Sequence, residues 1–141
     1  MAQKLKVLFV CVHNAGRSQM AAAFARQLGA DVLDADCAGT MPTNNVNPVV
    51  VQAMAEKSID LRGAKPTMLT KPMVKWADKV FTMGCSVEEA CPAVFVPSED
   101  WKLDDPAGQP IEKVRVIRDQ VEAHVKQLIV QVRSRQGAVR A

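Results

Sequence analysis

The segment from Cys11 to Ser18 carries the residue types of a nucleophilic site. Its sequence, CVHNAGRS, places an arginine six residues after a cysteine. A cysteine thiolate is a strong nucleophile, and a guanidinium offers two parallel donors that match a tetrahedral oxyanion. The hydroxyl of Ser18 can donate a hydrogen bond that stabilises the thiolate. The spacing therefore predicts an oxyanion site with Cys11 as the nucleophile at its base.

Cys11 lies between an apolar run and a helical pattern. Residues 4–11 are rich in Val, Leu and Phe, which is typical of a buried strand. Residues 18–28 carry an apolar side chain at every fourth position and predict a helix that ends at Gly29. A loop between a strand and a helix N-terminus turns backbone N–H groups toward one point, with the helix dipole behind them. The residues expected to bind the oxyanion are Val12, His13, Asn14, Ala15, Gly16 and Arg17. The alternative is an inert cysteine buried at a strand end.

Strands and helices alternate along the remaining chain. We expect strands at 32–38, 79–83 and 93–96, and a polar connection at 98–110. Asn47 and Pro48 favour a helix start that continues to Lys57, and Thr70 caps a short helix. Apolar residues at three- and four-residue steps predict a long amphipathic helix from Ile111 to Val132. This order predicts one α/β domain over residues 1–141, a sandwich with a parallel sheet that binds ligands beyond the carboxyl ends of its strands.

Composition excludes several classes of protein. The chain has 141 residues, of which 48% are hydrophobic and 23% charged, as in an ordinary globular domain. A net charge of +3 and 4% aromatic residues without tyrosine argue against a nucleic-acid partner. Because no apolar run approaches about 20 residues, and the run after Lys6 is too short for a signal peptide, we expect no membrane contact and a cytoplasmic location. Four cysteines in such a chain favour reactive or metal-binding thiols over structural disulfides.

Across nearly its whole length the sequence resembles the low-molecular-weight protein tyrosine phosphatases and the arsenate reductases that share their fold. The resemblance implies a four-stranded parallel sheet in the order 2-1-3-4, flanked by helices. It also implies a general-acid role for Asp105, with Asp104 as the second candidate, and a leaving oxygen does need a proton. The alternative for these two residues is a simple turn. The segments that carry the resemblance are Phe9–Cys11, Arg17–Ala21, Ala38–Gly39, Val46–Pro48 and Asp104–Gly108.

Within that superfamily, two details favour the reductases. The segment from Met83 to Pro92, with Cys85 and Cys91, resembles the redox segment of the thiol-coupled arsenate reductases, and Ala107 stands where the phosphatases commonly have an aromatic residue. The resemblance implies that Cys11 attacks arsenate, that Cys85 then attacks Cys11 and releases arsenite, and that Cys91 attacks Cys85. Thioredoxin would reduce the resulting disulfide between Cys85 and Cys91.

Several alternatives stay open at this point. Cys85 and Cys91 are separated by five residues, where a well-known reductase type has six, so a low-molecular-weight thiol with a glutaredoxin-like partner is a second candidate reductant. A phosphatase, and a redox- or oxyanion-sensing module without turnover, are the alternative functions. Incidental thiols are the alternative for the cysteine pair.

We expect no cofactor and no metal. A zinc site is disfavoured because the cysteines lack C-x2-C spacing and have only His13 and His124 as partners. Some relatives bind potassium through a carboxylate at the position of Ala22, so no structural cation is expected here. Cys37 is expected to be structural, and His13 is assigned no catalytic part.

Overall fold

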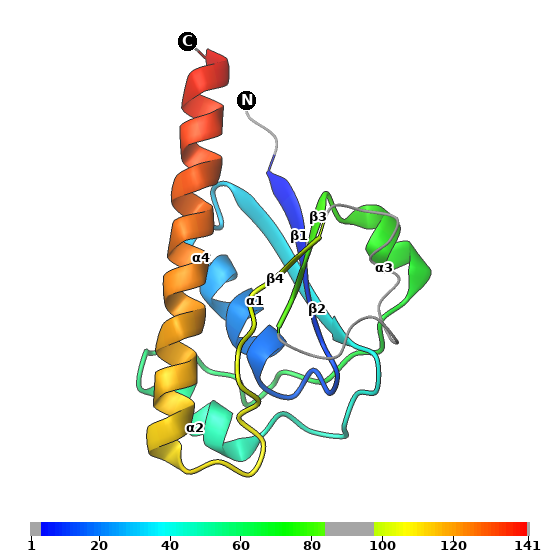
Figure 1. The fold of residues 1–141 in the computed structure, drawn as a ribbon, viewed down its shortest axis with the longest axis vertical. Coiled ribbons are helices and arrows are strands. Elements are labelled where there is room, and N and C mark those ends of the chain that lie inside the picture. The colour runs from blue at the N-terminus through cyan, green and yellow to red at the C-terminus, as the bar shows by residue number, and fades with distance from the viewer. Residues whose placement is uncertain (1–3, 84–97, 141) are drawn as a thin grey trace.

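Four parallel strands form the centre of the computed structural model, which describes residues 4–83 and 98–140, the last five without their side chains. The strands are β1 (Leu5–Cys11), β2 (Leu33–Gly39), β3 (Lys79–Thr82) and β4 (Ser98–Asp100), in the order β2-β1-β3-β4 (Figure 1). This order and the parallel pairing confirm the predicted sheet. Because every strand runs the same way, the chain leaves β1, β2 and β3 at one edge of the sheet, where Cys11 lies.

The fourth strand is not where the sequence predicted it. Residues 93–96, the expected strand, lie outside the described residues, whereas Ser98–Asp100, expected to be part of a polar connection, pair with β3. The prediction for 98–100 was wrong because it relied on apolar runs as the mark of a strand. In the part of the chain that the structure describes, β4 lies at the edge of the sheet and pairs with β3. An edge strand tolerates charged side chains such as Glu99 and Asp100. The sequence of this strand therefore lacks the apolar residues that indicate a buried strand.

Successive residues of β1 point into two separate cores, as the two-residue period of a strand requires. Val7, Phe9 and Cys11 pack into the larger core, and Leu8 and Val10 pack into the smaller one. The larger core lies beneath α1 (Arg17–Leu28), α2 (Pro48–Ala55) and α4 (Ile111–Arg140), and the smaller one beneath α3 (Lys71–Trp76). The sheet is thus covered by helices on both faces (Figure 1).

The helix starts match the predicted signals closely, whereas α4 continues to Arg140, eight residues beyond the predicted end at Val132. The Asn47 side chain accepts a hydrogen bond from the Val49 N–H, and the Thr70 hydroxyl accepts one from the Met73 N–H. Helix α1 begins one residue earlier than expected and ends at Leu28, with the N–H of Gly29 donating to the Ala25 carbonyl. Helix α2 ends at Ala55, two residues before the predicted end.

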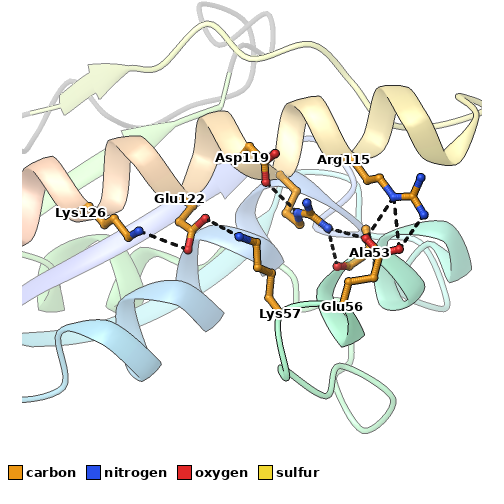
Figure 2. Close-up of polar contacts among 8 residues, drawn as sticks. Ala53, Glu56, Lys57, Arg115, Asp119, Glu122 and Lys126 are labelled. Carbon is orange, nitrogen blue, oxygen red and sulfur yellow. Dashed lines mark hydrogen bonds and ion pairs between the residues drawn. The ribbon is translucent and has the colours of Figure 1, made fainter.

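Helix α4 joins the body through an apolar stripe and a group of ion pairs. Its buried apolar residues follow the predicted periodicity and add Ile129, while Ile111 is only partly buried. They are Val114, Ile117, Val121, Val125, Leu128, Ile129 and Val132. Figure 2 shows the polar contacts, in which Glu56, just after α2, accepts hydrogen bonds from Arg115. Glu56 also accepts one from Arg118, at 2.7 Å. Within the described residues, no helix combines the length and apolarity that crossing a bilayer requires.

The ion pairs of Glu56 predict a specific loss of stability in acid. The hydrogen bonds from Arg115 and Arg118 lower the pKa of Glu56 from 4.5 to about 2. Because the folded-state pKa is the lower one, the stabilisation is complete above pH 4.5 and is lost as the pH falls toward 2. We expect the difference in free energy of unfolding between wild type and Glu56→Gln to be constant from neutral pH down to the ordinary glutamate pKa, and to shrink below it. Urea unfolding across this pH range measures the difference.

The matched control is Asp34→Asn, which changes an exposed carboxylate on β2. It reports how far a general change in charge alters unfolding in acid. A difference for Glu56→Gln that does not depend on pH, or that follows the control, would contradict the predicted role of the ion pairs.

Candidate active site

The thiol of Cys11 is buried at the carboxyl end of β1 and faces two hydrogen-bond donors. The backbone N–H of Asn14 donates to Cys11 Sγ at 3.1 Å, and Ser18 Oγ lies 2.9 Å from the same sulfur. The side-chain amide nitrogen of Asn14, Nδ2, donates to Ser18 Oγ at 2.6 Å. Because Ser18 Oγ accepts this bond, its own hydroxyl proton can point at the sulfur. A thiolate at Cys11 would accept both bonds. This arrangement has the geometry predicted for Cys11 and Ser18.

Asn14 shapes the loop between β1 and α1. Its φ of 50° lies in the left-handed region, which asparagine tolerates better than most residues. Asn14 is completely buried, and its Oδ1 accepts hydrogen bonds from the Thr67 N–H (2.8 Å) and the Gln19 amide (3.1 Å). The Gln19 amide also donates to the carbonyl oxygens of Asn14 and Lys65. These bonds hold a conformation that is costly on its own.

Sequence reasoning missed the roles of Gln19 and Thr67. Gln19 is a buried polar residue directly before the apolar run of α1 that begins at Met20, and this was the available signal. Thr67 offered none, because its contribution is a backbone N–H from a segment 53 residues away.

Gly39 makes room for the same loop. A Cβ at this position would lie 2.7 Å from the carbonyl oxygen of Val12 and 2.9 Å from the backbone nitrogen of Asn14. Backbone atoms cannot move aside as a side chain can, so only glycine lets the end of β2 pass this close to the loop. The Ala38–Gly39 pair noted in the sequence thus has a steric reason.

Arg17 ties three segments together at the site. Its side chain is buried, and Nη1 donates to the carbonyl oxygens of Met83 (2.7 Å) and Leu103 (3.1 Å). Nη2 lies 3.8 Å from Asp105 Oδ2. The first turn of α1 is therefore joined to the chain leaving β3 and to the segment after β4.

The two candidate acids have different surroundings. Asp105 is half exposed, lines the pocket described below and accepts a hydrogen bond from the Ala107 N–H at 2.9 Å. Asp104 instead bonds Lys113 Nζ at 2.9 Å, and this contact lowers the pKa of Asp104. A carboxyl group with a lowered pKa is a poor proton donor at neutral pH. The structure thus brings Asp105, and not Asp104, to the pocket.

A pocket of about 340 Å³ opens beside Cys11. Of the six residues predicted to bind an oxyanion, His13, Ala15, Gly16 and Arg17 line it, whereas Val12 and Asn14 do not. Residues 105–108 also line the pocket, and Thr43, Asn45 and Asn47 complete the lining. His13 Nδ1 lies 3.1 Å from the Met41 carbonyl oxygen, within hydrogen-bond distance.

The remaining cysteines divide into two groups. Cys37 is buried in β2, and burial raises its pKa to about 11, so the thiol stays protonated at neutral pH. This agrees with a structural role. Cys85 and Cys91 lie outside the described residues. In the part of the chain that the structure describes, no three His, Cys, Asp or Glu side chains form a group that could hold a metal ion.

Curated proteins of similar sequence are named as arsenate reductases. One from Halobacterium salinarum, named "Putative arsenate reductase", is 43% identical over 125 residues, covering 85% of this chain and 87% of its own. A "Glutaredoxin arsenate reductase" from Synechocystis is 36% identical over 131 residues, covering 90% and 98%.

Solved structures share the fold. An arsenate reductase in its phosphate-binding state superposes with a TM-score of 0.82 at 35% identity, covering 91% of this chain and 98% of that one. The YwlE arginine phosphatase of Geobacillus stearothermophilus also gives 0.82, at 26% identity and with 94% and 95% covered. A thioredoxin-dependent arsenate reductase of Corynebacterium glutamicum gives 0.78 at 29% identity, covering 94% of this chain and 63% of that one.

The family assignment follows from the whole length of the chain. Residues 6–138 match the family model described as low molecular weight phosphotyrosine protein phosphatase. This range includes the Cys11 loop, Arg17 and Asp105, which the structure gathers around one pocket. The chain is therefore a member of the low molecular weight phosphotyrosine protein phosphatase family.

Proposed function

We propose that this protein is an arsenate reductase in which Cys11 is the nucleophile. The pocket supports this role because it sets a buried sulfur beside a guanidinium and backbone N–H groups, a combination that suits a small tetrahedral oxyanion. The relatives from Halobacterium salinarum and Synechocystis, named as arsenate reductases, match most of the chain.

In the first step, the Cys11 thiolate attacks arsenic and forms a sulfur–arsenic bond. Hydroxide leaves from arsenic at the same time, and Asp105, which lines the same pocket, donates the proton that turns it into water. Arg17 and the N–H groups of His13, Ala15 and Gly16, which line the pocket, balance the negative charge on the remaining oxygens. Arsenic remains in its oxidised state, As(V), at this stage.

The hydrogen bond from Arg17 to the Met83 carbonyl is the observation that supports the proposed reduction step. Because Arg17 Nη1 donates to the Met83 carbonyl at 2.7 Å, the chain leaving β3 is anchored beside the pocket. Cys85 follows two residues later, and two residues of extended chain span at most about 7 Å. This tether supports a relay in which the Cys85 thiolate attacks Cys11 Sγ.

The relay reduces arsenic with two electrons from the cysteine thiols. A Cys11–Cys85 disulfide forms, the sulfur–arsenic bond breaks, and its electron pair stays on arsenic, which leaves as arsenite. Cys91 then attacks Cys85 and frees the Cys11 thiolate. A thioredoxin dithiol reduces the Cys85–Cys91 disulfide through a mixed disulfide.

Two observations favour alternatives strongly enough to be tested. The Synechocystis relative is named for glutaredoxin, whereas the Corynebacterium relative is described as thioredoxin-dependent. One structural relative is an arginine phosphatase, and phosphate has the same tetrahedral shape as arsenate. The first measurement is arsenate-dependent NADPH oxidation with thioredoxin and thioredoxin reductase, with phosphate as the control anion. Sustained oxidation that requires arsenate supports the proposal. No oxidation with either thioredoxin or glutathione plus glutaredoxin would favour the phosphatase.

The relay predicts a stalled intermediate when its last thiol is removed. We expect Cys91→Ser to form at most one arsenite per protein molecule and to stop with Cys11 and Cys85 joined, because nothing can then free Cys11. Cys11→Ser should form none. Quenched-flow measurement of arsenite, with mass spectrometry of the disulfides, checks both.

Cys37→Ala is the matched control for this experiment. Its thiol is buried and protonated and has no part in the relay, so this variant should complete many turnovers. Repeated turnover by Cys91→Ser with thioredoxin as the sole reductant would overturn the relay.

The two neighbouring aspartates are expected to differ sharply. Asp105→Asn should lower kcat by about 10²-fold or more, the usual contribution of a positioned general acid, and change the KM for arsenate far less. Asp104→Asn should change kcat little, because that side chain is bound to Lys113 and does not line the pocket. Steady-state kinetics of the two variants measures the contrast. Equal losses would show that the carboxylates act through charge alone.

A further inference from the structure

The segment that carries Asp105 lines the same pocket as the loop after β1. We call residues 103–108 the acid segment; it connects the end of β4 to the start of α4. Two of its contacts with the site are polar. Arg17 Nη1 donates to the Leu103 carbonyl at 3.1 Å, and Arg17 Nη2 lies 3.8 Å from Asp105 Oδ2. Both involve one long side chain, so they leave open what fixes the separation between the acid segment and the loop.

A direct contact between Gly16 and Pro106 sets that separation. A Cβ at Gly16 would lie 2.7 Å from Pro106 Cγ and 3.6 Å from Pro106 Cδ. Carbon atoms at van der Waals contact are about 3.5–4.0 Å apart, so the first distance is well inside contact. Pro106 is buried, and its ring is closed onto its own backbone, so it cannot rotate out of the way. A side chain at position 16 therefore requires the acid segment or the loop to shift, because the Pro106 ring cannot turn aside.

Displacement of Pro106 would move the carboxyl group of Asp105. The two residues are adjacent in the chain. Asp105 Oδ1 also accepts a hydrogen bond from the Ala107 N–H at 2.9 Å, which fixes the aspartate side chain to the backbone on the other side of Pro106. The side chain therefore follows the backbone of residues 105–107. The acid must reach the oxygen that leaves arsenic, and an error of about 1 Å in such a position costs about 10²-fold in rate.

We propose that Gly16 is a positioning residue for the general acid. Its missing side chain lets Pro106 rest directly on the loop and so holds Asp105 at the distance from Cys11 that proton transfer to the leaving oxygen requires. This role rests on the proposed function and is separate from any hydrogen bond that the Gly16 N–H donates to the oxyanion. In this proposal, the contact between Gly16 and Pro106 keeps the nucleophile Cys11 and the acid Asp105 aligned.

The experiment compares wild type, Gly16→Ala, Pro106→Ala and the double variant. Steady-state kinetics gives kcat for arsenate reduction, and protection of Cys11 from iodoacetamide by inorganic phosphate measures oxyanion binding without any chemistry. We expect Gly16→Ala to lower kcat by about 10- to 100-fold, while the phosphate protection constant stays within about twofold. The double variant should recover most of the lost kcat, because Pro106→Ala removes the ring atom that the new methyl group meets.

A second readout connects the loss to Asp105. If Gly16→Ala acts by displacing the acid, adding Asp105→Asn should lower kcat no further than Asp105→Asn does alone. The matched control is Gly63→Ala, which makes the same change where a Cβ would meet nothing within 4 Å. Its kcat and phosphate protection should equal those of wild type.

Three outcomes would overturn the proposal. The first is kcat of Gly16→Ala within about twofold of wild type; the second is the same loss with and without the Pro106 ring, which would place the effect in the loop itself. In both, an active wild type leaves the proposed function intact. The third is a wild-type protein that forms no arsenite, which overturns the proposed function and this inference with it.

Discussion

The site depends on the hydrogen bonds to one buried sulfur atom. Burial disfavours a charged thiolate, and Cys37 shows the consequence in the same molecule: its pKa is raised to about 11. Cys11 is at least as buried but faces the N–H of Asn14 and the hydroxyl of Ser18. The Asn14 N–H points back at Cys11 because the chain turns sharply at Asn14, whose φ is 50°. That conformation in turn requires Gln19 and Thr67 to bind the asparagine side chain, and it requires the end of β2 to be a glycine.

Arg17 extends this constraint to the rest of the pocket. It occupies the first position of α1, so its backbone is fixed by the same turn that directs the N–H groups of the loop. Its side chain then reaches the ends of two other elements, at Met83 after β3 and Leu103 after β4. Nη1 is used for these carbonyl oxygens, and Nη2 lies 3.8 Å from Asp105 Oδ2. The same side chain lines the pocket, so in the proposed function Arg17 both holds the walls of the pocket and binds the oxyanion.

The sequence was informative wherever the physical cause was local. The strand–loop–helix unit around Cys11, the caps at Asn47 and Thr70, and the apolar stripe of α4 all depend on residues within a few positions of one another, and each was predicted. The failures have tertiary causes. β4 is a polar edge strand that only its pairing with β3 defines. The preference for Asp105 over Asp104 was no failure, but it rested on the family resemblance, and its structural basis is also tertiary: Lys113, nine residues away, binds Asp104, whereas Asp105 lines the pocket. The part played by Thr67 is a backbone donor with no signature in the sequence at all.

The geometry also explains why one family holds both phosphatases and reductases. In the proposed function, the turn at Asn14, the Arg17 side chain and Asp105 would serve any tetrahedral oxyanion, since attack by sulfur and protonation of a leaving oxygen are common to both reactions. The reactions separate only afterwards, when either water attacks the central atom or a thiol attacks sulfur. That decision requires no change in the anion site. It requires a second thiol within reach of Cys11, which in the proposed relay is Cys85, two residues after the Met83 carbonyl that Arg17 binds. A change of function can then arise in the segment after β3, while the costly loop conformation around the buried sulfur is kept.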